Sequence, residues 1–109
     1  MNLISGATGF VGGRLLLALD KDSLVTRKLN RIPKELPGSV VADLSDIAAL
    51  TAACAGIETV FHCAGYAHAF SSLSGDNANL HRRINFEGTR NLVEAAGLAG
   101  VRRFVFLSS

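Results

Sequence analysis

Three glycines at three-residue intervals, Gly6, Gly9 and Gly12, restrict the possible folds of this chain more than any other feature. They follow a short apolar run at residues 3–5, and from Phe10 onward apolar residues recur at helical spacing. A strand, a glycine turn and a helix in this order predict a phosphate site, because the free N–H groups at the helix start face the turn. The alternative is an ordinary structural turn.

Each glycine has a separate predicted purpose. Gly6 permits the tight turn, Gly9 removes a side chain so that a pyrophosphate reaches the backbone, and Gly12 lets the helix pack closely on the sheet. The residues of this segment predicted to contact a dinucleotide are Gly6, Thr8, Gly9, Phe10, Val11 and Gly12.

The rest of the chain alternates between short apolar runs and helical patterns. Further strands are expected at residues 24–30, 40–42, 59–64 and 101–107. Helices are expected from Phe10 to Leu19 and over residues 46–55 and 80–98. Ser45 is placed to cap the second helix, and Gly97 or Gly100 ends the third. The apolar face expected on the third helix consists of Ile84, Leu92, Val93 and Ala96.

This alternation predicts an α/β fold with a doubly wound parallel sheet, covered by helices on both faces. Right-handed crossovers give the expected strand order 3-2-1-4-5, and the sheet stops after the fifth strand. Ligands of such sheets bind at the carboxyl ends of the first and fourth strands. The polar residues 71–79 indicate a loop or a disordered insertion.

The length and composition of the chain exclude several classes of protein. A chain of 109 residues forms at most one domain, and 49% hydrophobic with 18% charged residues excludes a disordered or fibrous protein. The net charge of +2 gives no indication of nucleic-acid or membrane-surface binding.

The two cysteines, Cys54 and Cys63, lie in apolar stretches without metal-ligand spacing, so we expect free thiols, no metal site and a reducing compartment. The N-terminus lacks the basic region of a signal peptide, and the apolar run 47–57 is too short to span a bilayer. We therefore expect a soluble, cytoplasmic protein.

The glycine spacing, Gly-x-x-Gly-x-x-Gly, resembles that of the extended short-chain dehydrogenase/reductase superfamily. Four further segments match in the same order, at residues 43–44, 62–65, 85–92 and 103–109. Together with residues 66–68 and 100–103, they look most like bacterial nucleotide-sugar epimerases and dehydratases of the NAD-dependent epimerase/dehydratase family. The resemblance implies a Rossmann domain over residues 1–109 that binds NAD or NADP.

The resemblance also implies site residues. Asp43 and Leu44 would contact the adenine, although a turn or capping role is the alternative for Asp43. The strand end at Cys63, Ala64 and Gly65 would line the cofactor. Asn85 would make a buried structural or cofactor-linked hydrogen bond, with an ordinary polar helix position as the alternative.

The matched segments also contain a candidate catalytic residue and a candidate core residue. Ser109 matches the catalytic serine that hydrogen-bonds the reacting oxygen of the substrate, whereas Ser108 is more structural. His62 lies within an apolar strand, which favours a satisfied core histidine over a general base.

The end of the second strand bears on the choice of cofactor. Members that select NAD place an acid there against the ribose 2′-hydroxyl, but residues 24–34 contain no Asp or Glu. Arg27, Lys28 and Arg31 are found instead, and Asn30 and Arg31 end the strand. An arginine suits a 2′-phosphate, which favours NADP over NAD, with a solvated strand end as the alternative.

The Tyr-x-x-x-Lys pair that the family's acid–base chemistry requires has no counterpart in these residues. The chain is then either the N-terminal part of a longer epimerase, dehydratase or reductase, inactive by itself, or a natural truncation. Alternatives are a non-catalytic dinucleotide-binding or sensing module and part of a flavonol- or steroid-type reductase. The exposed edge of the fifth strand predicts pairing with a second copy.

Overall fold

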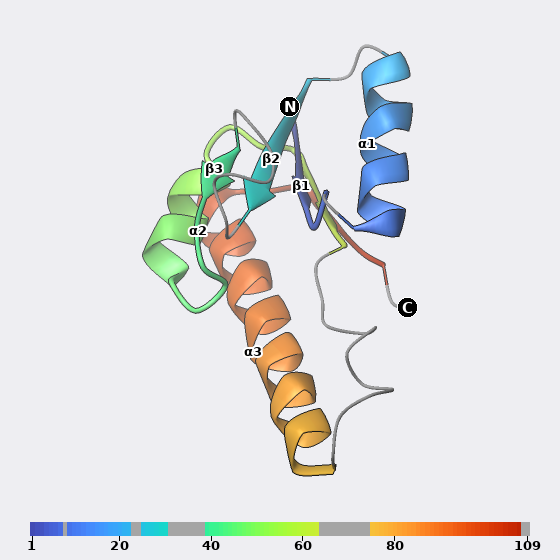
Figure 1. Cartoon of the computed structure of the whole chain (residues 1–109). Helices are drawn as coiled ribbons and strands as arrows, with labels where there is room; N and C mark the ends of the chain where they lie inside the picture. The colour runs from blue at the N-terminus through green and yellow to red at the C-terminus, as the bar shows by residue number, and fades with distance from the viewer. Residues whose placement is uncertain (8, 23–24, 31–38, 64–74, 108–109) are drawn as a thin grey trace.

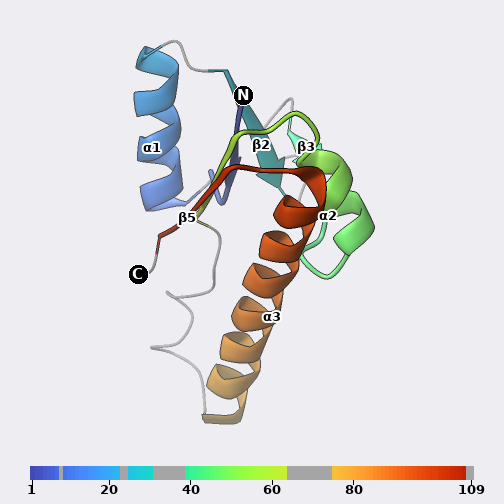
Figure 2. The same cartoon turned by 180° about the vertical axis from the view of Figure 1, so that it is seen from behind.

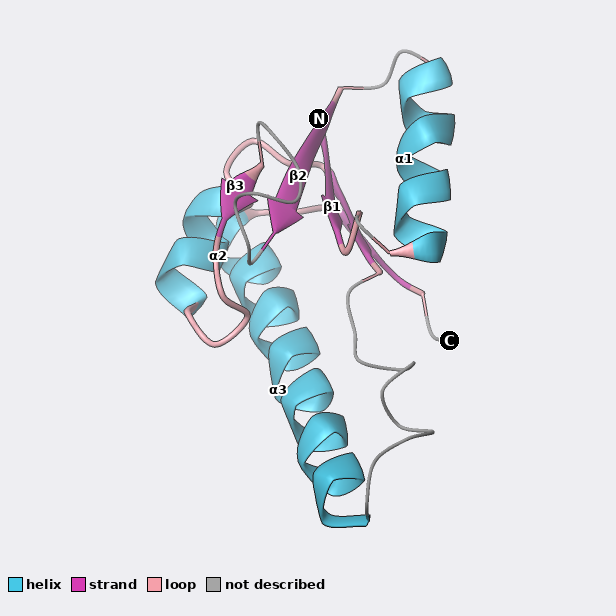
Figure 3. Cartoon of the chain, viewed as in Figure 1, coloured by secondary structure: helices cyan, strands magenta, loops and turns pink. Residues whose placement is uncertain are grey.

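The computed structural model describes residues 1–7, 9–22, 25–30, 39–63 and 75–107, without the side chains of 75–82 and 84. The strands are β1 (Asn2–Ser5), β2 (Thr26–Asn30), β3 (Val40–Val41), β4 (Thr59–His62) and β5 (Arg103–Phe106). The helices are α1 (Phe10–Lys21), α2 (Ile47–Ala53) and α3 (Gly75–Ala99). Figure 1 shows their arrangement, and Figure 3 shows helices and strands in separate colours.

All the strands run parallel in one sheet with the order β3-β2-β1-β4-β5, which confirms the predicted α/β topology. The register aligns Ser5 of β1 with Leu29 of β2 and His62 of β4. Phe106 of β5 is in turn opposite His62. The carboxyl ends of the strands therefore lie at one edge of the sheet, as the sequence predicts for a ligand crevice.

Helices cover both faces of the sheet. Figures 1 and 2 show α1 on one face, with α2 and α3 packed against each other on the opposite face. The main core lies on the α2–α3 side, where Leu3, Val60, Leu50 and Leu92 are fully buried. The N-terminal half of α3 extends past the carboxyl edge of the sheet, so this helix flanks the predicted crevice (Figure 1).

The starts of α2 and α3 differ from the sequence prediction. The N-cap of α2 is Asp46 and not Ser45, because the Asp46 carboxylate accepts a hydrogen bond from the Ala49 N–H at 3.1 Å. Helix α3 begins at Gly75, so the predicted loop is wrong from residue 75 onward, whereas residues 71–74 lie outside the described part. A helix that is already packed extends readily, since each added residue gains a backbone hydrogen bond.

The C-terminal half of α3 matches the predicted apolar face only in part. Leu92 and Ala96 are buried, whereas Val93 is 48% exposed and does not share their buried face. The side chain of Ile84, the remaining residue of the predicted face, lies outside the described part. Gly100 ends the helix in a left-handed conformation with φ of 82°, the geometry that glycine adopts without strain. No helix in the described residues is both long and apolar enough to cross a membrane.

Candidate functional site

The glycine turn has the geometry that its spacing predicts. Gly6 follows β1 with φ of 76°, and its carbonyl accepts the Gly9 N–H at 3.0 Å, which closes a tight turn. A Cβ atom added to Gly12 would lie 2.0 Å from the Gly6 oxygen. Gly12 is therefore the point at which α1 touches the turn, and a larger residue there would push the helix away.

The first turn of α1 is open to solvent and suits an anion. Gly9 is the N-cap with no side chain to satisfy the helix N–H groups, and the first turn contains no acidic residue. Phe10 and Val11 are exposed, and the Arg14 guanidinium lies 4.4 Å from the centre of the Phe10 ring. The N–H groups of the first turn, the positive end of the helix dipole and one nearby cation all favour a phosphate.

Other predicted site residues lie at the same edge of the sheet. Asn30 ends β2, Asp43 and Leu44 follow β3, and Cys63 follows β4. The parallel register therefore brings four strand ends to the edge where α1 begins. The predicted site residues Thr8, Arg31, Ala64, Gly65 and Ser109 lie outside the described residues.

Asp43 forms a turn ahead of α2. One carboxylate oxygen accepts the Ser45 N–H at 2.8 Å, and the Asp43 carbonyl accepts the Asp46 N–H at 3.0 Å. This is the turn role that the sequence left open for Asp43. Its side chain is exposed, and its contact with adenine stays a prediction.

The neighbouring Leu44 is held by α3. A Cβ on Gly88 would lie 3.0 Å from the Leu44 side chain, so the absence of one lets the leucine pack against the helix. The Asn91 amide donates to the Leu44 carbonyl at 2.8 Å. Two residues of the 85–92 segment thus fix the turn that would face the adenine.

A second set of contacts lies deeper, between β1, β4 and α3. Ser5 and His62 are buried, and the Ser5 hydroxyl is 2.6 Å from His62 Nδ1. On the other side of the ring, His62 Nε2 is 2.9 Å from the Thr89 hydroxyl. Burial lowers the pKa of His62 from 6.5 to about 4, so the ring is neutral at physiological pH. The prediction of a satisfied core histidine is confirmed.

Asn85 lies one turn before Thr89 on α3 and is half-buried. The segment 85–92 therefore spreads its polar side chains over neighbouring turns, with Thr89 against His62 and Asn91 against Leu44. The Asn85 contact with a cofactor stays a prediction.

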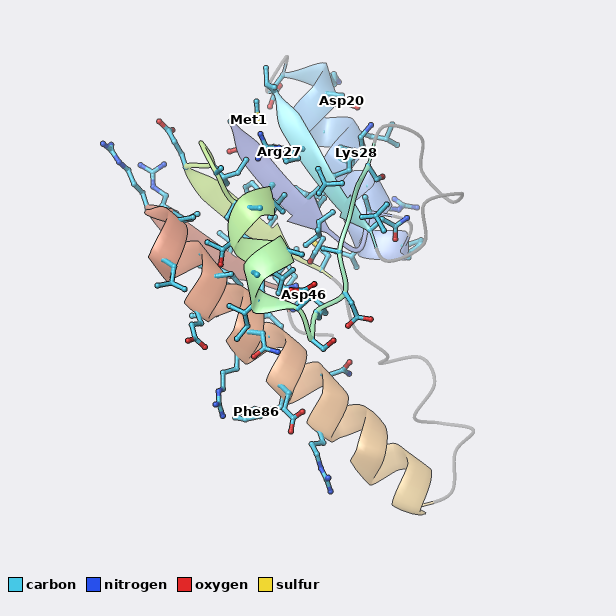
Figure 4. All side chains as sticks on the ribbon, turned by 90° about the vertical axis from the view of Figure 1, so that its left-hand side faces the viewer. Met1, Asp20, Arg27, Lys28, Asp46 and Phe86 are labelled. Atoms are coloured by element: carbon cyan, nitrogen blue, oxygen red, sulfur yellow. The ribbon has the colours of Figure 1, made fainter. Side chains whose placement is uncertain are left out.

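Arg27, one of the basic residues of β2, contacts the end of α2. The Arg27 guanidinium donates to the carbonyls of Ala53 and Ala55 at 2.6 and 2.8 Å, at the C-terminal end of α2. These are the last carbonyls of a helix, which a cation stabilises. Figure 4 shows Arg27 and Lys28 on neighbouring positions of the strand. The guanidinium of Arg27 is thus engaged at the C-terminal end of α2.

The sequence interpretation missed the roles of Ser5, Gly88, Thr89 and Asn91. Nothing in a single sequence pairs Ser5 with His62, which is 57 residues away, or His62 with Thr89, which is 27 residues away. The available signal was a polar residue at the end of an otherwise apolar strand, because buried hydroxyls need partners.

Residues 2–109 match the model of the NAD-dependent epimerase/dehydratase family. The chain is 35% identical to a 3-beta-hydroxysteroid dehydrogenase from Mycolicibacterium neoaurum, over 98% of this chain and 31% of that protein. It is 32% identical to a UDP-glucose 4-epimerase from Vibrio cholerae, over 98% of this chain and 34% of that protein.

Solved structures give the same result. A short-chain dehydrogenase/reductase superfamily protein from Agrobacterium tumefaciens with bound NAD superimposes with a TM-score of 0.81 at 36% identity, over 100% of this chain and 32% of that one. MoeE5 in complex with UDP-glucose and NAD superimposes with a TM-score of 0.80 at 33% identity, over 99% of this chain and 36% of that one. The chain spans about a third of the length of these proteins.

Proposed function

The chain belongs to the NAD-dependent epimerase/dehydratase family, and we propose that it is the dinucleotide-binding part of an NAD(P)-dependent epimerase, dehydratase or reductase. The observation that carries the proposal is the contact between Gly12 and the Gly6 turn, where a Cβ would lie 2.0 Å from a backbone oxygen. This close packing brings the open start of α1 to the carboxyl edge of the sheet, where a pyrophosphate would accept its N–H groups.

The residues of the chain fit such a cofactor. The turn and the α1 N-terminus would hold the pyrophosphate, Asp43 and Leu44 would contact the adenine, and Cys63 would line the cofactor. A nicotinamide cofactor supplies hydride transfer, and the protein contributes binding and orientation.

We propose NADP as the preferred cofactor, although a relative superimposes with bound NAD. The support is the absence of an acid in residues 24–34 and the presence of Arg31 at the end of the second strand. Arg27 is engaged by α2, so the proposal depends on Arg31. Titration calorimetry of the chain with each dinucleotide tests it. Tighter NADP binding that Arg31→Ala abolishes supports the role of Arg31, and equal or tighter NAD binding refutes it.

For the whole protein we propose hydride-transfer chemistry on a nucleotide sugar, with Ser109 orienting the reacting oxygen. The similarity to a UDP-glucose 4-epimerase and to a protein in complex with UDP-glucose supports this substrate class. The reading frame beyond Ser109 gives the test, since a Tyr-x-x-x-Lys downstream would supply the acid–base group. Turnover of UDP-glucose by that longer chain is the expected result.

Two other functions remain as candidates. A steroid-type dehydrogenase is supported by the 35% identity to a 3-beta-hydroxysteroid dehydrogenase, and a panel of sterols and nucleotide sugars separates the two substrate classes. A non-catalytic binding or sensing module would bind the dinucleotide but lack the tyrosine–lysine pair in its full reading frame.

We further propose that the protein resides in the cytoplasm and that the isolated chain pairs with a second copy through β5. The free thiols of Cys54 and Cys63 support a reducing compartment. Among the described strands, β5 has β4 as its only neighbour, and Phe106 is 52% exposed. An unpaired apolar edge of this kind favours association.

A further inference from the structure

A buried chain of hydrogen bonds links three elements beneath the proposed cofactor site. Ser5 ends β1, His62 ends β4 and Thr89 lies on α3. Ser5 is 2% and His62 1% exposed, so both side chains are shielded from solvent. The aromatic rings of Phe104 and Phe106 enclose His62, with ring centres at 6.1 and 5.5 Å.

The backbone of Cys63 is joined to these hydrogen bonds through Ser5. The Cys63 N–H points to the Ser5 carbonyl at 3.0 Å and to the Ser5 hydroxyl oxygen at 3.2 Å. The same hydroxyl oxygen therefore accepts the Cys63 N–H and is hydrogen-bonded to His62 Nδ1. A neutral imidazole carries one proton, so one ring nitrogen donates to its hydroxyl partner and the other accepts from its own, and the tautomer decides which is which.

We propose that Ser5, His62 and Thr89 are positioning residues that hold the backbone at Cys63 in place for cofactor binding. This inference rests on the proposed function. Cys63 is the first residue after β4, at the topological switch point between β1 and β4 where the cofactor would lie. Movement of this strand end would shift the surface that lines the cofactor, while the fold remains intact.

The order of donors and acceptors distinguishes this role from ordinary packing. Simple filling of the space between β4 and α3 needs only an apolar side chain, which avoids the cost of burying polar groups. Here a ring with one acceptor and one donor joins two hydroxyls, and the first hydroxyl holds the Cys63 amide. A side chain that reproduces the donor and acceptor should therefore restore function, whereas an apolar side chain of similar size should not.

The experiment compares His62→Gln with His62→Leu in the full 109-residue chain. Dissociation constants for NADP and NAD are measured by calorimetry at pH 7, where the wild-type ring is neutral. The matched control is Val60→Ala, a substitution of a fully buried residue on the same strand whose side chain has no polar group to join the hydroxyl chain. Amide hydrogen exchange at Cys63, without ligand, is the second readout.

We expect His62→Leu to weaken dinucleotide binding about tenfold, the equivalent of one lost hydrogen bond, and to speed exchange of the Cys63 amide. His62→Gln should bind within about twofold of wild type, because its amide offers one donor and one acceptor to the two hydroxyls. Val60→Ala should lower stability without changing affinity in the folded protein. If His62→Leu does not fold, Thr89→Val removes one hydroxyl at constant shape and should weaken binding in the same way.

Equal affinity of wild type and His62→Leu would overturn the inference, and so would equal losses in the Gln and Leu variants. An affinity loss in Val60→Ala as large as that in His62→Leu would show a general effect of stability and would also overturn it. Failure of the wild-type chain to bind either dinucleotide contradicts the proposed function instead. In that case the exchange rate at Cys63 still tests whether His62 holds the strand end.

Discussion

Gly12 is the residue on which the geometry of the phosphate site depends most. An added Cβ would lie 2.0 Å from the Gly6 oxygen and 2.7 Å from the Gly6 carbonyl carbon, and these are backbone atoms that cannot move independently. We predict that Gly12→Ala destabilises the chain by about 1–3 kcal/mol and abolishes dinucleotide binding, because α1 must move away from the turn.

Gly97 provides the matched control for this substitution. It also lies in a helix, but an added Cβ would meet nothing within 4 Å. Gly97→Ala should stabilise the chain by about 0.5–1 kcal/mol through helix propensity and leave binding unchanged. Urea unfolding and calorimetry measure both quantities. Similar effects of the two substitutions would contradict the role assigned to Gly12.

His62 makes the stability of the fold depend on pH. Its pKa is lowered from 6.5 to about 4 by burial, so between these values the unfolded chain binds a proton that the folded chain does not. Among the described residues, the ring contacts the Ser5 and Thr89 hydroxyls and two phenylalanine rings, none of which carries charge.

The free energy of unfolding should therefore fall by about 3 kcal/mol as the pH is lowered from 6.5 to 4. His62→Gln should lose this part of the pH dependence, while the parts due to other groups remain. Urea unfolding at a series of pH values measures both chains. Identical pH profiles for the two would contradict the assignment of a neutral, buried ring.

At the scale of elements, the start of α2 gives a clear test of capping. Asp46 accepts the Ala49 N–H, and Figure 4 shows it at the beginning of the helix. We predict that Asp46→Ala costs about 1 kcal/mol of stability and that Ser45→Ala changes it by less than about 0.5 kcal/mol. Chemical denaturation of both variants compares them directly. A larger loss of stability for Ser45→Ala than for Asp46→Ala would contradict the assignment of Asp46 as the N-cap.

The helices and strands also show which features of the fold could be predicted from the sequence. The glycine turn, the parallel sheet and its strand order follow from local patterns, because short apolar strands and glycine spacing are properties of neighbouring residues. Asp46 and Ser45 are both good capping residues, so pattern alone cannot choose between them. The contacts of Thr89 and Asn91 join residues that are 27 and 47 positions from their partners. Only the packing of α3 on the sheet and on α2 determines them.

Helix α3 therefore does more than cover the sheet. Thr89 contacts the His62 chain, and Gly88 and Asn91 hold the Leu44 turn. One helix thus fixes two separate strand ends at the carboxyl edge. Phe86 is 67% exposed on the same helix and projects outward, so this part of its surface is not used by the core (Figure 4).

At the scale of the whole molecule, we expect the isolated chain to associate through the edge of β5, which has β4 as its only neighbour among the described strands. Val105 and Leu107 are 36% and 38% exposed, and we predict that the apparent mass in light scattering rises with concentration. Val105→Lys should restore a monomer, because a charge on the edge opposes pairing. Leu98→Lys changes an exposed apolar residue on α3 and should leave association unaffected. A clean monomer of the wild-type chain at high concentration would contradict edge pairing.

The central claim is that the turn after β1 and the start of α1 bind a dinucleotide. The most direct measurement follows the backbone amides of the chain by NMR during titration with NADP or NAD. We predict saturable shifts at Gly9, Phe10, Val11 and Gly12, with a further shift at Cys63. Absence of any shift at saturating ligand, or shifts confined to residues away from the carboxyl edge of the sheet, would contradict the claim.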